Sequence, residues 1–152
     1  MIKHIWSVLC REALIDSETN NVSLLNIFER LEINISLPKD ITIPVDVPIT
    51  YELVSLWVKD NLTKEEELDI NISIISPENE IVNQLSKKMV IPIDKARMRS
   101  RIKITGLKIT KSGNYLFQIA VKEMNSKKFT TEAELPLEVV IHEDVKKSKT
   151  TN

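Results

Sequence analysis

Strict alternation of apolar and polar residues near the C-terminus constrains the fold of this chain more than any other feature. From Phe129 to Ile141 the odd positions hold mostly apolar residues and the even positions mostly Thr or Glu. Successive side chains on a β-strand point to opposite faces, so a period of two predicts a strand with one face in a core and one in solvent. We therefore expect the apolar residues of 129–141 to pack inward.

Shorter alternating runs fill the rest of the chain, and they are rich in Ile and Val, whose branched side chains suit a pleated sheet. Only residues 62–68 could form a helical turn. The fold class predicted is all-β, an antiparallel β-sandwich. The expected strands are 3–14, 22–36, 48–59, 67–75, 81–91, 97–109, 115–124 and 129–142, with 41–47 as a possible edge strand on which Pro44 and Pro48 would need no ladder partner.

Glycine is scarce, so Asn, Asp and Pro must build most of the turns. Turn signals recur about every ten residues, a spacing that suits a sandwich or a barrel. One of the two glycines, Gly106, lies inside an expected strand. The apolar positions are even before it (Ile102, Ile104) and odd after it (Leu107, Ile109), and this one-residue change of phase indicates a β-bulge.

Composition favours one folded domain. At 152 residues with 42% hydrophobic and 28% charged residues, the chain is large and apolar enough to form a core. We expect a single domain over 1–145 and a disordered tail over 146–152. The 21 basic and 22 acidic residues give a net charge of −1. Binding to nucleic acid or to an anionic membrane would therefore require a local basic patch.

The N-terminal segment and the cysteine content indicate a cytoplasmic location. The single cysteine, Cys10, cannot form an internal disulfide. The apolar stretch at the N-terminus is interrupted by His4 and is shorter than a signal-peptide core, and no run approaches the ~20 apolar residues that cross a bilayer. We expect no membrane association.

One short motif resembles a known structural corner. Gly113-Asn114-Tyr115, between two expected strands, resembles the late corner of immunoglobulin-like sandwiches, with Phe117 in the place of the antibody cysteine. The resemblance implies that the Tyr115 ring is buried and that its hydroxyl bonds the main chain just upstream. Gly113 and Tyr115 are therefore the predicted structural corner.

The layout of the whole chain also resembles a family of small bacterial proteins of uncharacterised activity. The shared features are an N-terminal strand that ends in a cysteine, a charged stretch, a second strand reading like 22–28, and a Gly-x-Tyr near the C-terminus. This resemblance implies an immunoglobulin-like or C2-like β-sandwich, and it implies no activity.

The residue sets of common enzyme and metal sites are missing. Two glycines cannot make a dinucleotide fingerprint or a P-loop. Structural zinc normally takes four Cys or His ligands, and the chain has three such residues, His4, Cys10 and His142. Cys10 could act as a nucleophile with His142 only if the first and last strands paired. Otherwise Cys10 is a small buried hydrophobe and His142 a surface histidine. We predict no catalytic residues, no metal and no cofactor.

A basic stripe is the feature that stands out most. Every odd residue of 95–103 is a cation, namely Lys95, Arg97, Arg99, Arg101 and Lys103. On one strand these side chains share a face over roughly 25 Å, with Ala96, Met98, Ser100 and Ile102 turned inward. The stripe could dock an acidic partner or bind a phosphate backbone. It could instead only prevent edge-to-edge aggregation, neutralised by the acidic face of Glu132, Glu134 and Glu138 on a neighbouring strand.

These observations lead to a main hypothesis and two alternatives. The main hypothesis is a non-enzymatic protein-interaction module or accessory subunit that binds a protein partner or itself. The first alternative is polyanion or nucleic-acid binding through residues 95–103, against which the lack of interleaved aromatic residues counts. The second is an enzyme with an unrecognised site of Glu and Ser residues.

Overall fold

The structure, a computed structural model, describes residues 1–36 and 44–142 and contains strands but no helix in those ranges. Accordingly, nothing in the described ranges could cross a membrane as a helix. The described residues form nine strands: β1 (Ile2–Ile15), β2 (Val22–Ile27), β3 (Arg30–Asn34), β4 (Val45–Lys59), β5 (Glu66–Ile75), β6 (Ile81–Ile91), β7 (Arg97–Ile109), β8 (Gly113–Glu123) and β9 (Thr130–His142).

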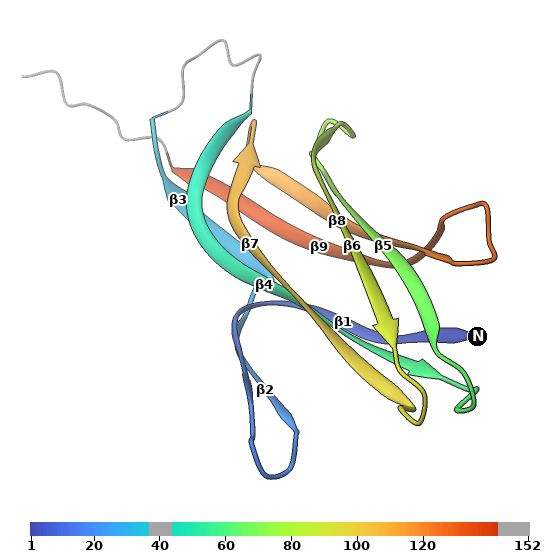
Figure 1. Ribbon diagram of the computed structural model, residues 1–152. Coiled ribbons are helices and arrows are strands. Elements are labelled where there is room, and N and C mark those ends of the chain that lie inside the picture. The colour runs from blue at the N-terminus through green and yellow to red at the C-terminus, as the bar shows by residue number, and fades with distance from the viewer. Residues whose placement is uncertain (37–43, 143–152) are drawn as a thin grey trace, which may run out of the picture.

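Two sheets form a β-sandwich (Figure 1). The first sheet has the order β2-β1-β4-β7, and the second has the order β3-β9-β8-β5-β6. The all-β class predicted from the alternation is confirmed. The purely antiparallel arrangement is wrong for one pair, because β3 runs parallel to β9 while the other paired strands are antiparallel.

The core lies between the facing sides of the two sheets. Tyr51 and Trp57 from β4 and Phe117 from β8 are among its largest buried side chains, and the Tyr51 and Phe117 rings meet edge to face with centroids 6.0 Å apart. From β9, Leu137 and Val139 are fully buried. Ala133, Leu135 and Ile141 pack against the same core, whereas Phe129 precedes the strand and is exposed under the Lys122 ammonium.

The expected strand 22–36 is two strands that belong to different sheets. β2 pairs with β1, and β3 pairs with β9. Asn26 has a positive φ of 50°, and after Ile27 the chain leaves the first sheet and joins the second. Alternation cannot reveal such a crossing, because both strands keep the same period of two.

Four other expectations concern the segments 41–47, 62–68 and 146–152 and the irregularity at Gly106. Residues 45–47 of the expected edge strand 41–47 are the start of β4, and 37–43 lie outside the described residues, as does the expected tail 146–152. Residues 62–68 contain no helical turn, and β5 begins at Glu66. The register between β4 and β7 shifts between Val47 and Thr50, opposite Gly106, whose φ is +86°, so the irregularity predicted there is confirmed.

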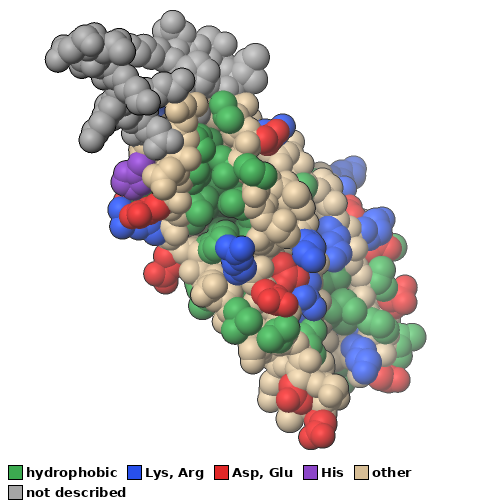
Figure 2. Space-filling view, turned by 90° about the vertical axis from the view of Figure 1, so that its left-hand side faces the viewer, with side chains coloured by type: hydrophobic (Ala, Val, Ile, Leu, Met, Phe, Trp, Pro, Cys, Tyr) green, Lys and Arg blue, Asp and Glu red, His purple; other side chains and the backbone are tan. Residues whose placement is uncertain are grey.

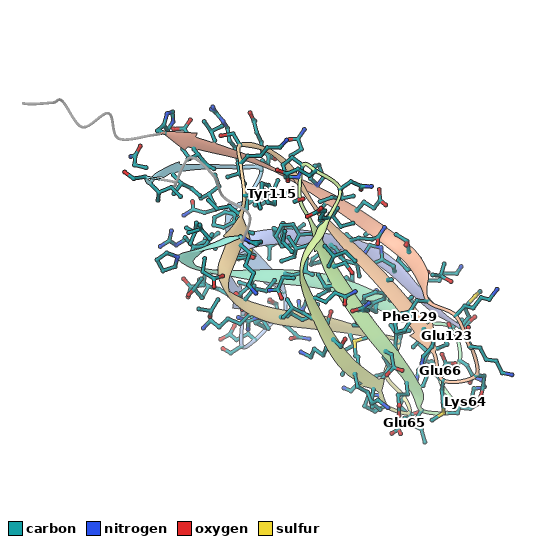
Figure 3. All side chains as sticks on the ribbon, turned by 90° about the horizontal axis from the view of Figure 1, so that it is seen from above. Lys64, Glu65, Glu66, Tyr115, Glu123 and Phe129 are labelled. Carbon is teal, nitrogen blue, oxygen red and sulfur yellow. The ribbon has the colours of Figure 1, made fainter. Side chains whose placement is uncertain are left out.

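Tyr115 fixes the corner between β7 and β8. Its ring is fully buried, and its hydroxyl accepts a hydrogen bond from the Thr110 amide (2.8 Å) and donates one to the Lys111 carbonyl (2.9 Å). Gly113 is needed because its φ is +146° and because a Cβ there would lie 2.8 Å from the Pro77 ring. In Figure 3, Tyr115 lies far from the labelled residues at the other end of the sandwich.

Replacing Tyr115 by Phe should lower the free energy of unfolding by about 1 to 2 kcal/mol, because the Thr110 amide and Lys111 carbonyl lose their partner while the ring stays. Chemical denaturation of the two proteins measures this difference. Tyr51→Phe is the matched control, since among the described residues the Tyr51 hydroxyl makes a single, longer bond, 3.3 Å to the Gly106 carbonyl. Equal stability of wild type and Tyr115→Phe would contradict the corner interpretation.

Candidate functional site

The N-terminal strand forms the wall of the site by changing partners along its length. β1 pairs with β4 from Ile2 to Cys10, and with β2 from Cys10 to Ile15. The hairpin of β1 and β2 therefore extends past the segment in which β1 pairs with β4 (Figure 1). A second apolar cluster, separate from the main core, joins the hairpin to β4; it contains Cys10, Ala13 and Val54, with Trp6, Val8, Val22 and Leu24 packed against it.

The hairpin turn has its own hydrogen bonds. The Asp16 carboxylate accepts from the Glu18 and Thr19 amides, both at 2.8 Å, and these bonds lower the pKa of Asp16. Asn20 adopts a positive φ of 57°, which Asn tolerates better than most residues. The turn is thus well defined even though it contains no glycine.

An ion pair holds the hairpin against the sheet. Once β1 has left β4, the main-chain groups of Ala13 have no strand partner on that side. The Glu52 carboxylate accepts from the Ala13 amide (2.6 Å), and the Arg101 guanidinium donates to the Ala13 carbonyl (3.0 Å). Glu52 and Arg101 also pair with each other at 2.8 Å. At Ala13, these two side chains therefore take the place of the main-chain hydrogen bonds that a neighbouring strand would make.

The structure places four of the five predicted basic residues on one strand. Arg97, Arg99, Arg101 and Lys103 alternate along β7, an edge strand of the first sheet, and Lys95 lies in the turn before it. Of the residues expected to turn inward, Ser100 is buried and accepts from the Trp57 indole (2.9 Å). Ala96 is exposed, because it precedes the strand and does not follow the strand's alternation.

Two of the predicted cations are already engaged within the molecule. Arg101 binds Glu52, and Arg99 donates to the Asn20 carbonyl (2.6 Å) and the Asn20 side chain (2.9 Å). Within residues 1–36 and 44–142, Lys95, Arg97 and Lys103 have no carboxylate within 4.0 Å. Of the three arginines that alternate along this strand, only Arg97 makes no such contact with the described residues.

The acidic face of β9 does not neutralise the stripe. Glu132, Glu134 and Glu138 belong to the second sheet, where β9 lies between β3 and β8. Glu138 pairs with Arg30 at 3.6 Å, and Glu134 accepts from the Gln118 amide. The carboxylate that does meet the stripe is Glu52, on the strand next to β7.

A groove of about 700 Å³ lies between the hairpin and the basic strand. Ile15 and Val22 of the hairpin, with Trp6, Leu56 and Met98 of the sheet, supply apolar lining. The remaining lining is Thr19, Asn20, Asn21 and Pro92 together with four cations, Lys95, Arg97, Arg99 and Arg101. The groove thus combines apolar surface with positive charge.

A smaller groove continues on the other side of Arg101. It is lined by Arg11, Glu12, Glu52 and Lys103 beside Pro48, Ile49 and Thr50. Figure 2 shows one side of the molecule, where cationic and anionic side chains are interspersed and apolar side chains fill a hollow. The groove at Lys95 to Arg101 differs from this mixture because the charged residues that line it are all cations.

The predicted Cys and His candidates do not meet. Cys10 lies in the first sheet and His142 in the second, with the His142 ring 3.7 Å from Glu32. Burial raises the pKa of the Cys10 thiol, and the nearby Glu52 charge raises it further, which disfavours the nucleophilic thiolate.

A polar network on the other side of β1 was not anticipated. The His4 ring lies 2.6 Å from the Ser7 hydroxyl, which lies 2.6 Å from the Ser55 hydroxyl of β4. Burial lowers the pKa of His4, whose ring packs edge-on against Trp57. These contacts link β1 to β4.

The acidic turn before β5 lies at one end of the sandwich. Lys64, Glu65 and Glu66 gather there with Glu123, as Figure 3 shows. Within the described ranges, no three His, Cys, Asp or Glu side chains are arranged to hold a metal ion.

Sequence reasoning missed three residues of the candidate site. Trp6 lines the groove, Asn20 binds Arg99, and Glu52 binds Arg101. The one available signal was Glu52 itself, a carboxylate inside a long apolar strand, since such a buried charge nearly always has a partner.

Comparisons with known proteins give little similarity. No protein-family model matches the chain, and no curated protein matches its sequence. Among solved structures, the chain is similar to a Bordetella pertussis protein provisionally named ApaA, with 11% sequence identity and a TM-score of 0.37 over 63% of this chain and 88% of that one.

Proposed function

We propose that this protein is a non-enzymatic interaction module whose groove between the β1–β2 hairpin and β7 binds an acidic segment of a partner protein. The observation that carries the proposal is the composition of the groove: four cations, of which Lys95 and Arg97 have no carboxylate partner among the described residues, stand beside apolar side chains. A segment with carboxylates on one face and apolar residues on the other would satisfy both kinds of lining.

The four cations have different roles in the groove. Arg99 donates hydrogen bonds to Asn20, and Arg101 donates to Ala13 and Glu52, so these two side chains hold the groove in shape. Lys95 and Arg97 are exposed and retain their donors for a ligand. An Arg guanidinium can grip a carboxylate with two parallel hydrogen bonds, which makes Arg97 the expected anchor and Lys95 an auxiliary charge.

A polyanion is the second candidate ligand, and Trp6 favours it. The sequence alone showed no aromatic residue interleaved with the basic stripe, but the fold brings Trp6 of β1 into the same groove as Lys95 and Arg97. Cations beside an aromatic ring are the usual elements of single-stranded nucleic-acid sites. The net charge of −1, however, provides no wider attraction for a polyanion.

The test measures binding of a fluorescent peptide of alternating Glu and Leu by anisotropy, in parallel with a heparin oligosaccharide and a single-stranded oligonucleotide. Reversing Lys95 and Arg97 together to Glu should weaken the peptide at least about tenfold, because each lost charge contact is worth on the order of 1 kcal/mol and the new carboxylates repel it. The inward-facing core is untouched, so the melting temperature should stay unchanged.

The matched control is Lys127→Glu with Lys128→Glu, two exposed cations in the turn before β9 that give the same change in net charge. This control should bind the peptide like wild type. If both double variants weakened peptide binding equally, the effect would come from the overall charge of the protein and not from the groove, and the proposal would be contradicted. Tighter binding of heparin or the oligonucleotide than of the peptide would select the polyanion candidate instead.

The type of sandwich and the compartment are further parts of the proposal. We propose an immunoglobulin-like or C2-like sandwich of a bacterial protein, supported by the Tyr115 corner. We also propose a cytoplasmic location, supported by the single, buried and unpaired Cys10.

A further inference from the structure

The four edge strands of the sandwich differ in how they are protected against pairing. β7 and β2 border the first sheet, and β3 and β6 border the second. An edge strand presents unpaired main-chain donors and acceptors, and proteins usually block such an edge with charges, proline or shortness. β7 carries five cations (Arg97, Arg99, Arg101, Lys103 and Lys108), β6 carries Lys87 and Lys88, and the short β3 carries Arg30 and Glu32.

β2 is nearly as short as β3, with six residues against five, but it lacks the other two protections. Its sequence, Val-Ser-Leu-Leu-Asn-Ile, contains no charge and no proline. Within the described residues its only strand partner is β1, on one side. The opposite edge of the hairpin is occupied, because the Ala13 main chain binds Glu52 and Arg101. The outer edge of β2 is therefore the free edge of this hairpin.

Exposed apolar side chains lie beside this free edge. Leu25 and Ile27 of β2 are 43% and 53% exposed, and Leu14 of β1 is 48% exposed. By register, Leu14 lies opposite Ser23 and Leu25 opposite Glu12, so Leu14 and Leu25 share one side of the hairpin with Glu12, away from the side of Ala13 and Leu24. Ile27, at the end of β2, lies opposite Cys10 and lines a hollow with Leu135 and Pro136 of β9. Exposed apolar side chains thus lie beside the free edge, together with one carboxylate.

We infer that β2 pairs with β2 of a second copy of this chain, which would join two four-stranded sheets into one of eight strands. A strand that runs antiparallel to its own copy satisfies two-fold symmetry, in which the same patch meets itself. Self-pairing needs an edge without like charges, because like charges directly opposite each other destabilise a strand pair. β2 meets this condition, whereas the cations of β7 and β6 would repel their own copies. The exposed Leu25 and Ile27 of the two copies would then lie on adjacent strands.

Sedimentation velocity of the full chain over a micromolar to submillimolar range tests the inference. Wild type should sediment as a species of twice the 17.4 kDa chain mass. Leu25→Lys, and separately Ile27→Lys, should give the monomer, since each places a charge on the pairing edge. Both residues are exposed, so the thermal unfolding of the monomeric variants should remain cooperative; two variants guard against a folding defect in one.

Ile81→Lys is the matched control, because Ile81 is an exposed apolar residue on the edge strand β6 of the other sheet. This variant should remain dimeric. A monomeric wild type at every concentration, a dimeric Leu25→Lys protein, or loss of the dimer in Ile81→Lys alone would each overturn the inference. The test is independent of the proposed function, since Leu25→Lys should bind the acidic peptide as wild type does whether or not it dimerises.

Discussion

Replacing Lys59 by Met is expected to lower the free energy of unfolding by about 3 kcal/mol, the largest effect of any single exchange considered for this protein. Lys59 is only 2% exposed, and its ammonium donates to three main-chain carbonyls, those of Lys64 (2.8 Å), Ile91 (3.3 Å) and Pro92 (2.6 Å). Met has a similar length but no donor. The three carbonyls, which belong to two different loops and the end of β6, would therefore lose a shared partner.

Thermal and chemical denaturation measure this loss, which corresponds to a fall in melting temperature of about 10 °C for a domain of this size. Lys127→Met, at an exposed position, should change the stability little. Because Pro92 lines the groove, Lys59→Met should also weaken binding of the acidic peptide. A stability within experimental error of wild type would show that water replaces the ammonium at all three carbonyls.

The second large effect is expected for Glu52→Gln, which should lower the free energy of unfolding by about 2 to 3 kcal/mol. One carboxylate oxygen accepts from Arg101 and the other from the Ala13 amide, and the Glu52 side chain is only 7% exposed. A glutamine has one acceptor, so its amide group must face one of the two donors. The expected loss is smaller than for a fully buried ion pair, because the Arg101 side chain is 39% exposed and therefore partly solvated.

Hydrogen exchange locates this effect. Exchange of the Ala13 amide should accelerate in Glu52→Gln more than that of core amides such as Leu53, because the hairpin is released before the sandwich unfolds. Glu134→Gln, a change at an exposed carboxylate of β9, is the control and should leave both stability and Ala13 exchange unchanged. An Ala13 amide that exchanges at the wild-type rate in Glu52→Gln would contradict the interpretation that Glu52 and Arg101 hold the hairpin against the sheet.

Part of this structure could be predicted because it depends on neighbours along the chain. Alternation identified most of the strands, since the side-chain period of a strand is a local property. The change of phase at Gly106 identified the bulge for the same reason. The stripe on β7 followed from spacing alone, and four of its five cations do share that strand.

The environment of the stripe could not be predicted, because it depends on which strands become neighbours. The sequence suggested Glu132 to Glu138 as the neutralising carboxylates, yet β9 belongs to the other sheet and Glu52 on β4 is the partner of Arg101. Likewise, nothing near residue 20 indicates that Asn20 binds Arg99, since the two are 79 positions apart.

The sequence by itself determined that this protein is built of strands and that one strand carries a row of cations. Only the tertiary structure decided that β1 leaves β4 at Cys10, that the hairpin reaches Arg99 and Arg101, and that Trp6 joins Lys95 and Arg97 in one groove. The physical reason is that strand periodicity is fixed by backbone geometry within a few residues. The choice of neighbouring strands is instead set by burial and hydrogen bonding summed over the whole chain.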